Sequence, residues 1–99
     1  MSELPDRDSF APLLNSRFQL EGSSESIELE LTEVSELHEA RGRASFSLVF
    51  RGPGDRFLAQ ETYRFHHSAL GAIDLFIVPI GQDEQGLYYE AVFNLLRKR

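Results

Sequence analysis

The sequence contains no cysteine and no tryptophan among its 99 residues. Without a thiol the chain can form no disulfide, supply no thiolate to a metal ion and use no cysteine nucleophile. A chain of this length buries enough apolar surface to fold without such a staple. We therefore expect a single domain over residues 1–99, and the lack of cysteine favours a reducing, cytoplasmic location.

Long hydrophobic runs are also missing. The longest, from Ile73 to Ile80, is interrupted by Asp74 and Pro79 and is far shorter than the ~20 residues that a membrane-spanning helix needs. Residues 1–8 carry several charges and lack the apolar core of a signal peptide. We expect neither a membrane segment nor a secretory leader, and we expect residues 1–7 to form a flexible N-terminus.

The sequence also has no excess of positive charge. The formal net charge of −6 repels nucleic-acid phosphates, and the basic tail at residues 97–99 is too short to form a nucleic-acid patch. Residues 1–40 hold ten acids and two bases, whereas residues 41–99 hold six acids and eight bases. This asymmetry is either a solvated acidic surface or a pair of complementary patches that orient neighbouring subunits.

What the sequence does contain is a series of apolar strands separated by turns. The alternation is clearest from Ile27 to Leu31, where every second residue is apolar and the residues between them are acidic. β-Branched and aromatic residues fill the later segments, as suits a pleated, half-buried surface. The pattern predicts six strands, at about residues 16–21, 26–37, 44–51, 57–66, 72–80 and 87–96.

A short helix is expected ahead of these strands. Phe10 and the leucines three and four residues after it share one helical face. Asp8 or Ser9 is placed to cap the start of this helix, and Asn15 is placed to end it.

The alternation of the strands breaks at two places. Near residues 32–33 the inward phase shifts by one residue, which a β-bulge explains. Leu58 is out of phase with Tyr63 and Phe65, so either a second bulge separates them or Glu61 points inward. The cost of an unpaired buried carboxylate favours the bulge. Residues 38–43 are interpreted as a charged connection.

Consecutive strands joined by short turns usually lie side by side. The sequence therefore predicts a mainly β domain: a six-stranded antiparallel meander that forms a small barrel or a tight sandwich. The short N-terminal helix is expected across one face or one open end.

No pattern in the sequence indicates a metal or cofactor site. His66 and His67 are adjacent, so a regular strand points them to opposite faces, and His38 lies apart. Loop 81–86 lacks the alternating acidic ligands of a calcium loop, and residues 52–54 are not followed by the lysine of a phosphate loop. We expect no metal, no cofactor and no catalytic residue.

Three carboxylates nevertheless leave an enzymatic alternative open. Glu61, Asp74 and Glu90 fall within apolar strands, where a low dielectric raises carboxyl pKa values and suits acid–base chemistry. Each is explained more simply as an outward residue or as the partner of Arg51 or Arg64. The sequence does not show that any two of them converge.

Two strands that are apolar on both faces predict an interaction surface. The last two expected strands need cover on both sides, and a short helix cannot cover both along their length. Phe76, Val78, Tyr88 and Val92 are the candidate surface, and self-association, most simply as a dimer, is the expected use of it. We therefore rank a non-catalytic protein-interaction or assembly module first.

A small-ligand-binding barrel is the alternative. In that arrangement Tyr63, Tyr88, Tyr89 and His66 supply polar tips inside an apolar cavity. A filled interior would count against it, because barrels with few strands usually pack shut.

Several strings in the sequence together resemble a known family. In order, they are Phe46–Pro53, Gln60–Tyr63, His67–Gly71, Leu75–Pro79 and Tyr89–Asn94. The set resembles an uncharacterised bacterial domain-of-unknown-function family and is DUF6916-like. That family has no assigned activity, so the resemblance implies no catalytic residue. Its relatives lie near genes for phage-tail-like proteins, which implies an accessory role in assembly.

Overall fold

The computed structural model describes residues 7–21 and 27–96, with side chains described as far as Asn94. A short α-helix and a 3-10 turn precede seven strands. Their bounds are α1 Arg7–Phe10, η1 Ala11–Leu13, β1 Arg17–Leu20, β2 Ile27–Val34, β3 His38–Ala40, β4 Arg43–Gly52, β5 Glu61–His67, β6 Gly71–Asp83 and β7 Gly86–Leu96.

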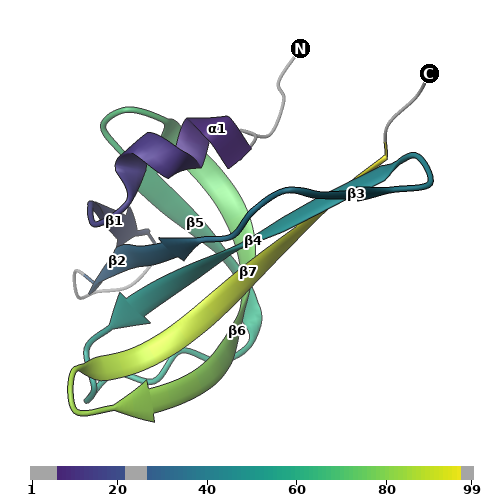
Figure 1. Ribbon diagram of the computed structural model, residues 1–99. Helices are drawn as coiled ribbons and strands as arrows, with labels where there is room; N and C mark the ends of the chain where they lie inside the picture. Colours follow the sequence, from purple (N-terminus) through teal and green to yellow (C-terminus); the bar gives the residue numbers. More distant parts are fainter. Residues whose placement is uncertain (1–6, 22–26, 97–99) are drawn as a thin grey trace.

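Six of the strands close into an antiparallel barrel, as the sequence predicts. Around the barrel the order is β1, β2, β4, β7, β6 and β5, and β5 pairs with β1 to complete the ring. The helix α1 lies over one open end, and β3 extends away from the barrel together with the ends of β4 and β7 (Figure 1). We call this three-stranded extension the arm.

One link of the expected meander is wrong. Strands β4 and β5 follow each other in the sequence but do not pair; β4 instead pairs with β2 and β7. The connection between β4 and β5 contributes Leu58, which is 9% exposed, to the core. Strand β5 begins only at Glu61, so Leu58 precedes it. The bulge expected between Leu58 and Tyr63 is therefore absent. Glu61 has the inward phase, opposite Ile77, as the alternative expectation had it, but the residue is exposed.

The other expected bulge is confirmed. The register between β2 and β4 shifts between Leu31 and Glu33. A second irregularity lies between Pro79 and Gly81, where β6 pairs with β7. Proline has no N–H to give to a ladder, so an irregular position tolerates it best.

The charged segment 38–43 is a hairpin and not the plain connection that we expected. Ala40 pairs with Arg43, which leaves Arg41 and Gly42 as a two-residue turn. Both turn residues have positive φ, 54° and 77°, as the tight hairpin turns compatible with strand twist require. Arginine rarely adopts this conformation, so the residues of the segment do not indicate a hairpin.

The N-terminal helix starts earlier than expected. Because α1 begins at Arg7, Asp8 and Ser9 lie inside its first turn and not at its cap. Residues 1–6 of the expected flexible segment lie outside the described residues, whereas Arg7 donates from Nε to the carbonyl oxygen of Ser35 at 2.7 Å. Asn15 has φ 73° and ends the helical segment as predicted.

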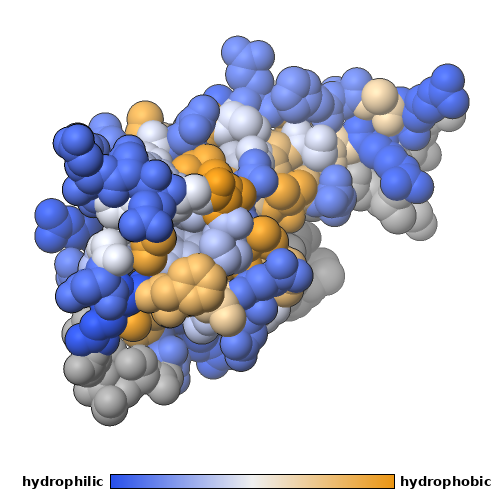
Figure 2. All heavy atoms as spheres, turned by 90° about the horizontal axis from the view of Figure 1, so that it is seen from below, coloured by the Kyte–Doolittle hydropathy of each residue, from blue (hydrophilic) through white to orange (hydrophobic). Residues whose placement is uncertain are grey.

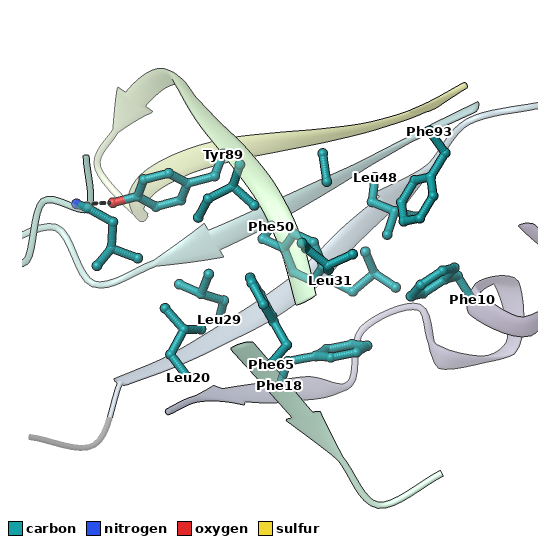
Figure 3. Close-up of a cluster of buried hydrophobic side chains, with 14 of the residues drawn as sticks. Phe10, Phe18, Leu20, Leu29, Leu31, Leu48, Phe50, Phe65, Tyr89 and Phe93 are labelled. Carbon is teal, nitrogen blue, oxygen red and sulfur yellow. Dashed lines mark hydrogen bonds between the residues drawn. The ribbon is translucent and has the colours of Figure 1, made fainter. Parts of the chain in front are cut away.

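The barrel interior is packed with aromatic and aliphatic side chains from every strand of the ring (Figure 3). Phe10 is fully buried and packs against Phe46 and Phe93, with ring centroids 6.3 and 5.6 Å away. Tyr89 fills the opposite end of the same cluster, as Figure 3 shows. The helix therefore acts as an apolar plug for one end of the barrel.

Replacing Phe10 tests this plug. Phe10→Ala should lower the free energy of unfolding by about 3–5 kcal/mol, because it empties a fully buried aromatic site. Urea unfolding followed by circular dichroism measures the loss. Leu14→Ala is the control: Leu14 is 43% exposed, and its truncation should cost less than about 1 kcal/mol. Equal losses in the two variants would contradict the plug.

Candidate functional site: the outer surface of β6 and β7

The four residues of the expected interaction surface lie on two adjacent strands. Phe76 and Val92 are 50% and 57% exposed, and Val78 and Tyr88 are half-buried. They point outward because their sequence neighbours, such as Leu75, Ile77 and Ala91, point into the core. The structure thus places all four on the outer side of the β6–β7 pair.

Ile80 belongs to the same outer surface. It is 50% exposed and lies at the irregularity of β6, between Pro79 and Gly81. We call Phe76, Val78, Ile80, Tyr88 and Val92 the outer apolar patch. Figure 2 shows hydrophobic residues interrupting the hydrophilic surface of the barrel body, whereas the tapering end of the molecule is largely hydrophilic.

Beside this patch, β6 and β7 separate. The two strands pair only between Val78–Asp83 and Gly86–Glu90. The first half of β6, up to Ile77, pairs instead with β5, and the last part of β7 pairs only with β4 among the described residues. We call the two facing edges, residues 71–77 and 91–96, the open seam.

The seam contains a shallow hollow of about 320 Å³. Its lining combines core-facing and outward residues of both strands: Asp74, Leu75, Phe76, Ala91, Val92, Phe93 and Asn94. One carboxylate is present, and Arg64 holds it through hydrogen bonds of 2.9 and 3.3 Å. These hydrogen bonds from Arg64 also hold the pKa of the Asp74 carboxyl below its ordinary value.

The polar groups at the hairpin end of the patch are engaged within the chain. The Tyr88 hydroxyl donates to Asp83 at 3.0 Å, and the backbone N–H of Gln85 donates to the same carboxylate at 2.8 Å. The second of these bonds is the main reason why the pKa of Asp83 is lowered. Arg51 contacts Glu30 at 2.6 Å and Gln85 at 3.0 Å. This end of the patch is therefore held in shape by its own network.

The three candidate carboxylates do not form a pair. Glu61 lies opposite the inward Ile77, whereas Glu90 lies opposite the outward Val78, so they belong to opposite faces of the sheet. Asp74 shares the outer face with Glu90. It lies four residues along β6 from Val78, about 13 Å at the rise of a strand. That distance exceeds the separation of carboxylates that act together on one bond.

The histidines also occupy separate environments. His66 contacts Glu21 at 2.7 Å, while His67 faces the other way and lies 2.9 Å from the hydroxyl of Ser16. The expected division of the two between faces is therefore present. No group of three potential metal ligands occurs among residues 7–21 and 27–96.

The Ser16–His67 contact was not foreseen from the sequence. His67 Nδ1 accepts the N–H of Ala69 at 2.9 Å, so Nε2 carries the proton and donates to Ser16. The serine hydroxyl in turn donates to the carbonyl oxygen of Leu13 at 2.6 Å. A nucleophilic serine needs the opposite polarity, with the histidine accepting its proton. The pair therefore ties η1 to the end of β5.

The residues expected to line a ligand cavity do not meet. Tyr63 donates to the carbonyl oxygen of Ala59 at 2.9 Å, and His66 and Tyr88 lie on the outside of the barrel. Tyr89 alone is fully buried. Its hydroxyl accepts the N–H of Leu58 at 3.0 Å, so the polar tip in the interior already has a backbone partner.

A family model matches residues 5–93, which is most of the chain and includes every residue of the outer apolar patch. The chain belongs to the DUF6916 family. The family is described as a domain of unknown function. No curated protein and no solved structure matches the chain. Within the described part of this DUF6916 domain, no helix has the length and apolar character needed to cross a bilayer.

The Tyr89 hydroxyl of this DUF6916 domain can be tested directly. Tyr89→Phe removes the acceptor of the buried Leu58 N–H and should lower the free energy of unfolding by about 1–3 kcal/mol at pH 7. Urea unfolding measures this loss, and Tyr63→Phe, whose hydroxyl contact is exposed, is the matched control.

The same residue gives stability a pH dependence. Burial raises the pKa of the Tyr89 phenol above its ordinary value of 10.0. The unfolded chain therefore loses this proton first, and stability should fall as the pH rises above about 10 and through the folded pKa. Urea unfolding between pH 8 and pH 12 should show a shallower decline in Tyr89→Phe than in the wild type. An identical decline would contradict this account of Tyr89.

Proposed function

We propose that this DUF6916 domain is a non-catalytic protein-interaction or assembly module, and that the outer apolar patch is its contact surface. The observation that carries the proposal is the exposure of Phe76 and Val92 on adjacent strands beside the open seam. Exposed apolar surface rimmed by polar residues is typical of protein-contact sites, and among the described residues Glu90 is the one charged residue within this surface, opposite Val78. Here the rim is the network around Asp83 at one end and the Arg64–Asp74 pair at the other.

The energetic incentive for covering this patch is substantial. Full burial of a large apolar side chain stabilises a complex by about 1.5–3 kcal/mol. Phe76, Ile80 and Val92 each retain about half of their surface. Covering the three would contribute roughly 3 kcal/mol, or about a hundredfold in the dissociation constant. This is the scale of a contact centre and not of a scattered surface residue.

The scattered positions of Glu61, Asp74 and Glu90 support a non-catalytic role. The packed interior and the internally bonded Tyr89 likewise favour a contact surface over a ligand cavity. Two finer proposals accompany the function. One is an accessory role in a phage-tail-like assembly, which the family resemblance suggests. The other is a cytoplasmic location, which the cysteine-free sequence favours.

Phe76→Ser tests the proposed surface, with Phe57→Ser as its matched control. Both replacements remove an exposed phenylalanine, but Phe57, which is 68% exposed, lies in the connection between β4 and β5. Sedimentation equilibrium at micromolar concentration measures self-association. Co-purification from native lysate, followed by reconstitution with the purified partner, measures association with another protein.

We expect Phe76→Ser to weaken the complex at least fivefold, because half of a large aromatic surface no longer becomes buried. Phe57→Ser should leave the complex unchanged. The proposal is contradicted if the two variants and the wild type give the same mass and the same reconstituted affinity.

A further inference from the structure

The part of β7 that continues past its pairing with β6 has an unusual edge. Residues 91–96, Ala-Val-Phe-Asn-Leu-Leu, contain no charge, no proline and no glycine. On one side they pair with β4. On the other side no strand pairs with them among the described residues, because the pairing with β6 stops at Glu90. Unprotected strand edges of this kind are templates for pairing with another strand.

The opposite edge of the same arm provides a comparison within the molecule. Strand β3 also pairs only with β4, but it is three residues long and carries His38 and Glu39. Short length and charge are the devices by which proteins protect an edge from unwanted pairing. One edge of the arm thus carries these devices, and the β7 edge lacks them.

We infer that the β7 edge pairs with the β7 edge of a second copy of this chain. The pairing is antiparallel and follows a two-fold axis perpendicular to the arm. It joins the two arms into one six-stranded sheet with the order β3-β4-β7-β7-β4-β3. The inference rests on the proposed function in one respect: the outer apolar patch adjoins this edge, so the second arm lies beside the patch.

The symmetry restricts the register of this pairing. Residues directly opposite each other in a sheet point to the same face, and a two-fold axis perpendicular to the sheet keeps the outer face of each copy on the same side. The axis must therefore lie midway between the two copies of one residue, so that this residue pairs with its own copy. Phe93 and Asn94 are the central residues of the edge. A centre at Asn94 pairs the exposed asparagine with its own copy and leaves Phe93 in the core, where it packs against Phe10.

Charge supports a second copy as the occupant. The distal end of the arm carries Arg41 and Arg43, and antiparallel alignment brings this end beside the barrel of the partner. The outer face there carries Asp74 and Glu90. Basic groups at the distal end of one arm therefore approach acidic groups on the outer face of the partner.

Single cysteines test the pairing cleanly, because the natural chain has none. In the proposed dimer the two copies of residue 94 are direct cross-strand neighbours, with Cβ atoms about 5 Å apart. Mild oxidation of Asn94→Cys should therefore give a covalent dimer. Ser45 lies level with Asn94 on β4, so its two copies are three strand spacings apart, about 14 Å. Ser45→Cys should stay unlinked. Gln19→Cys, at an exposed position on β1, should also stay unlinked and controls for cross-links formed by random collision.

A charge variant provides the second measurement. The wild type should sediment above 11.3 kDa at micromolar concentration, and its amides from residue 91 to residue 96 should exchange slowly with solvent. Asn94→Lys places like charges opposite each other at the axis. It should sediment as a monomer and exchange these amides at least tenfold faster. Ser45→Lys adds the same charge to the same face, one strand away from the edge, and should remain a dimer.

The outcomes separate this inference from the proposed function. A wild type that sediments at 11.3 kDa overturns the edge pairing, as does a dimer in which Asn94→Cys fails to cross-link or in which Ser45→Cys cross-links equally well. The proposed function stands in those cases if Phe76→Ser still weakens a reconstituted complex. It falls if Phe76→Ser changes no complex, whatever the cysteine variants show.

Discussion

The ladder between β4 and β7 is the interaction on which the rest of the structure depends. It joins ten residue pairs, from Arg43 with Leu96 to Gly52 with Leu87. On one side of it lie β2 and β1, and on the other lie β6 and β5. The second closure of the barrel, between β1 and β5, consists of only two pairs. The barrel thus consists of two three-stranded sheets that are joined mainly by the long ladder between β4 and β7.

This arrangement also accounts for the packed interior. Phe46, Leu48 and Phe50 on β4 face inward opposite Phe93, Ala91 and Tyr89 on β7, so the small Ala91 lies between two large aromatic residues of its strand. Phe10 covers this row at one end, and Leu58 reaches it at the other. Because side chains fill the centre, the distinctive chemistry of the molecule lies on its outer surface.

The strands and the core could be predicted because alternation is a local property of the sequence. Apolar residues recur at every second position from Ile27 to Leu31 and from Phe46 to Phe50, as the pleat of a strand requires. The one-residue shift of this pattern near Thr32 indicated the bulge in β2. The outer patch was equally readable, since both phases of β6 and β7 are apolar. The pairing of β4 with β7 in place of β5 could not be predicted in this way, because strands that follow each other in the sequence only tend to lie side by side.

Other features were beyond a local pattern for identifiable reasons. Arg41 has a positive φ, which arginine rarely adopts, so the local sequence does not indicate the hairpin or the arm. The Ser16–His67 contact joins residues 51 positions apart. The open seam depends on where β6 changes partner from β5 to β7, at Ile77 and Val78.

The length of the central ladder ties stability to association. Strands β4 and β7 continue past the point where β6 leaves β7 at Glu90, so the last six residues of β7 extend the ladder without a neighbour on the seam side. Ending both strands where β6 leaves β7 would remove the open edge, but it would also remove the positions of Phe46 and Phe93, against which the Phe10 plug packs. The fold therefore cannot retain this plug without also presenting an edge. An uncharged edge next to exposed Phe76 and Val92 is the part of the molecule with the most to gain from a second strand.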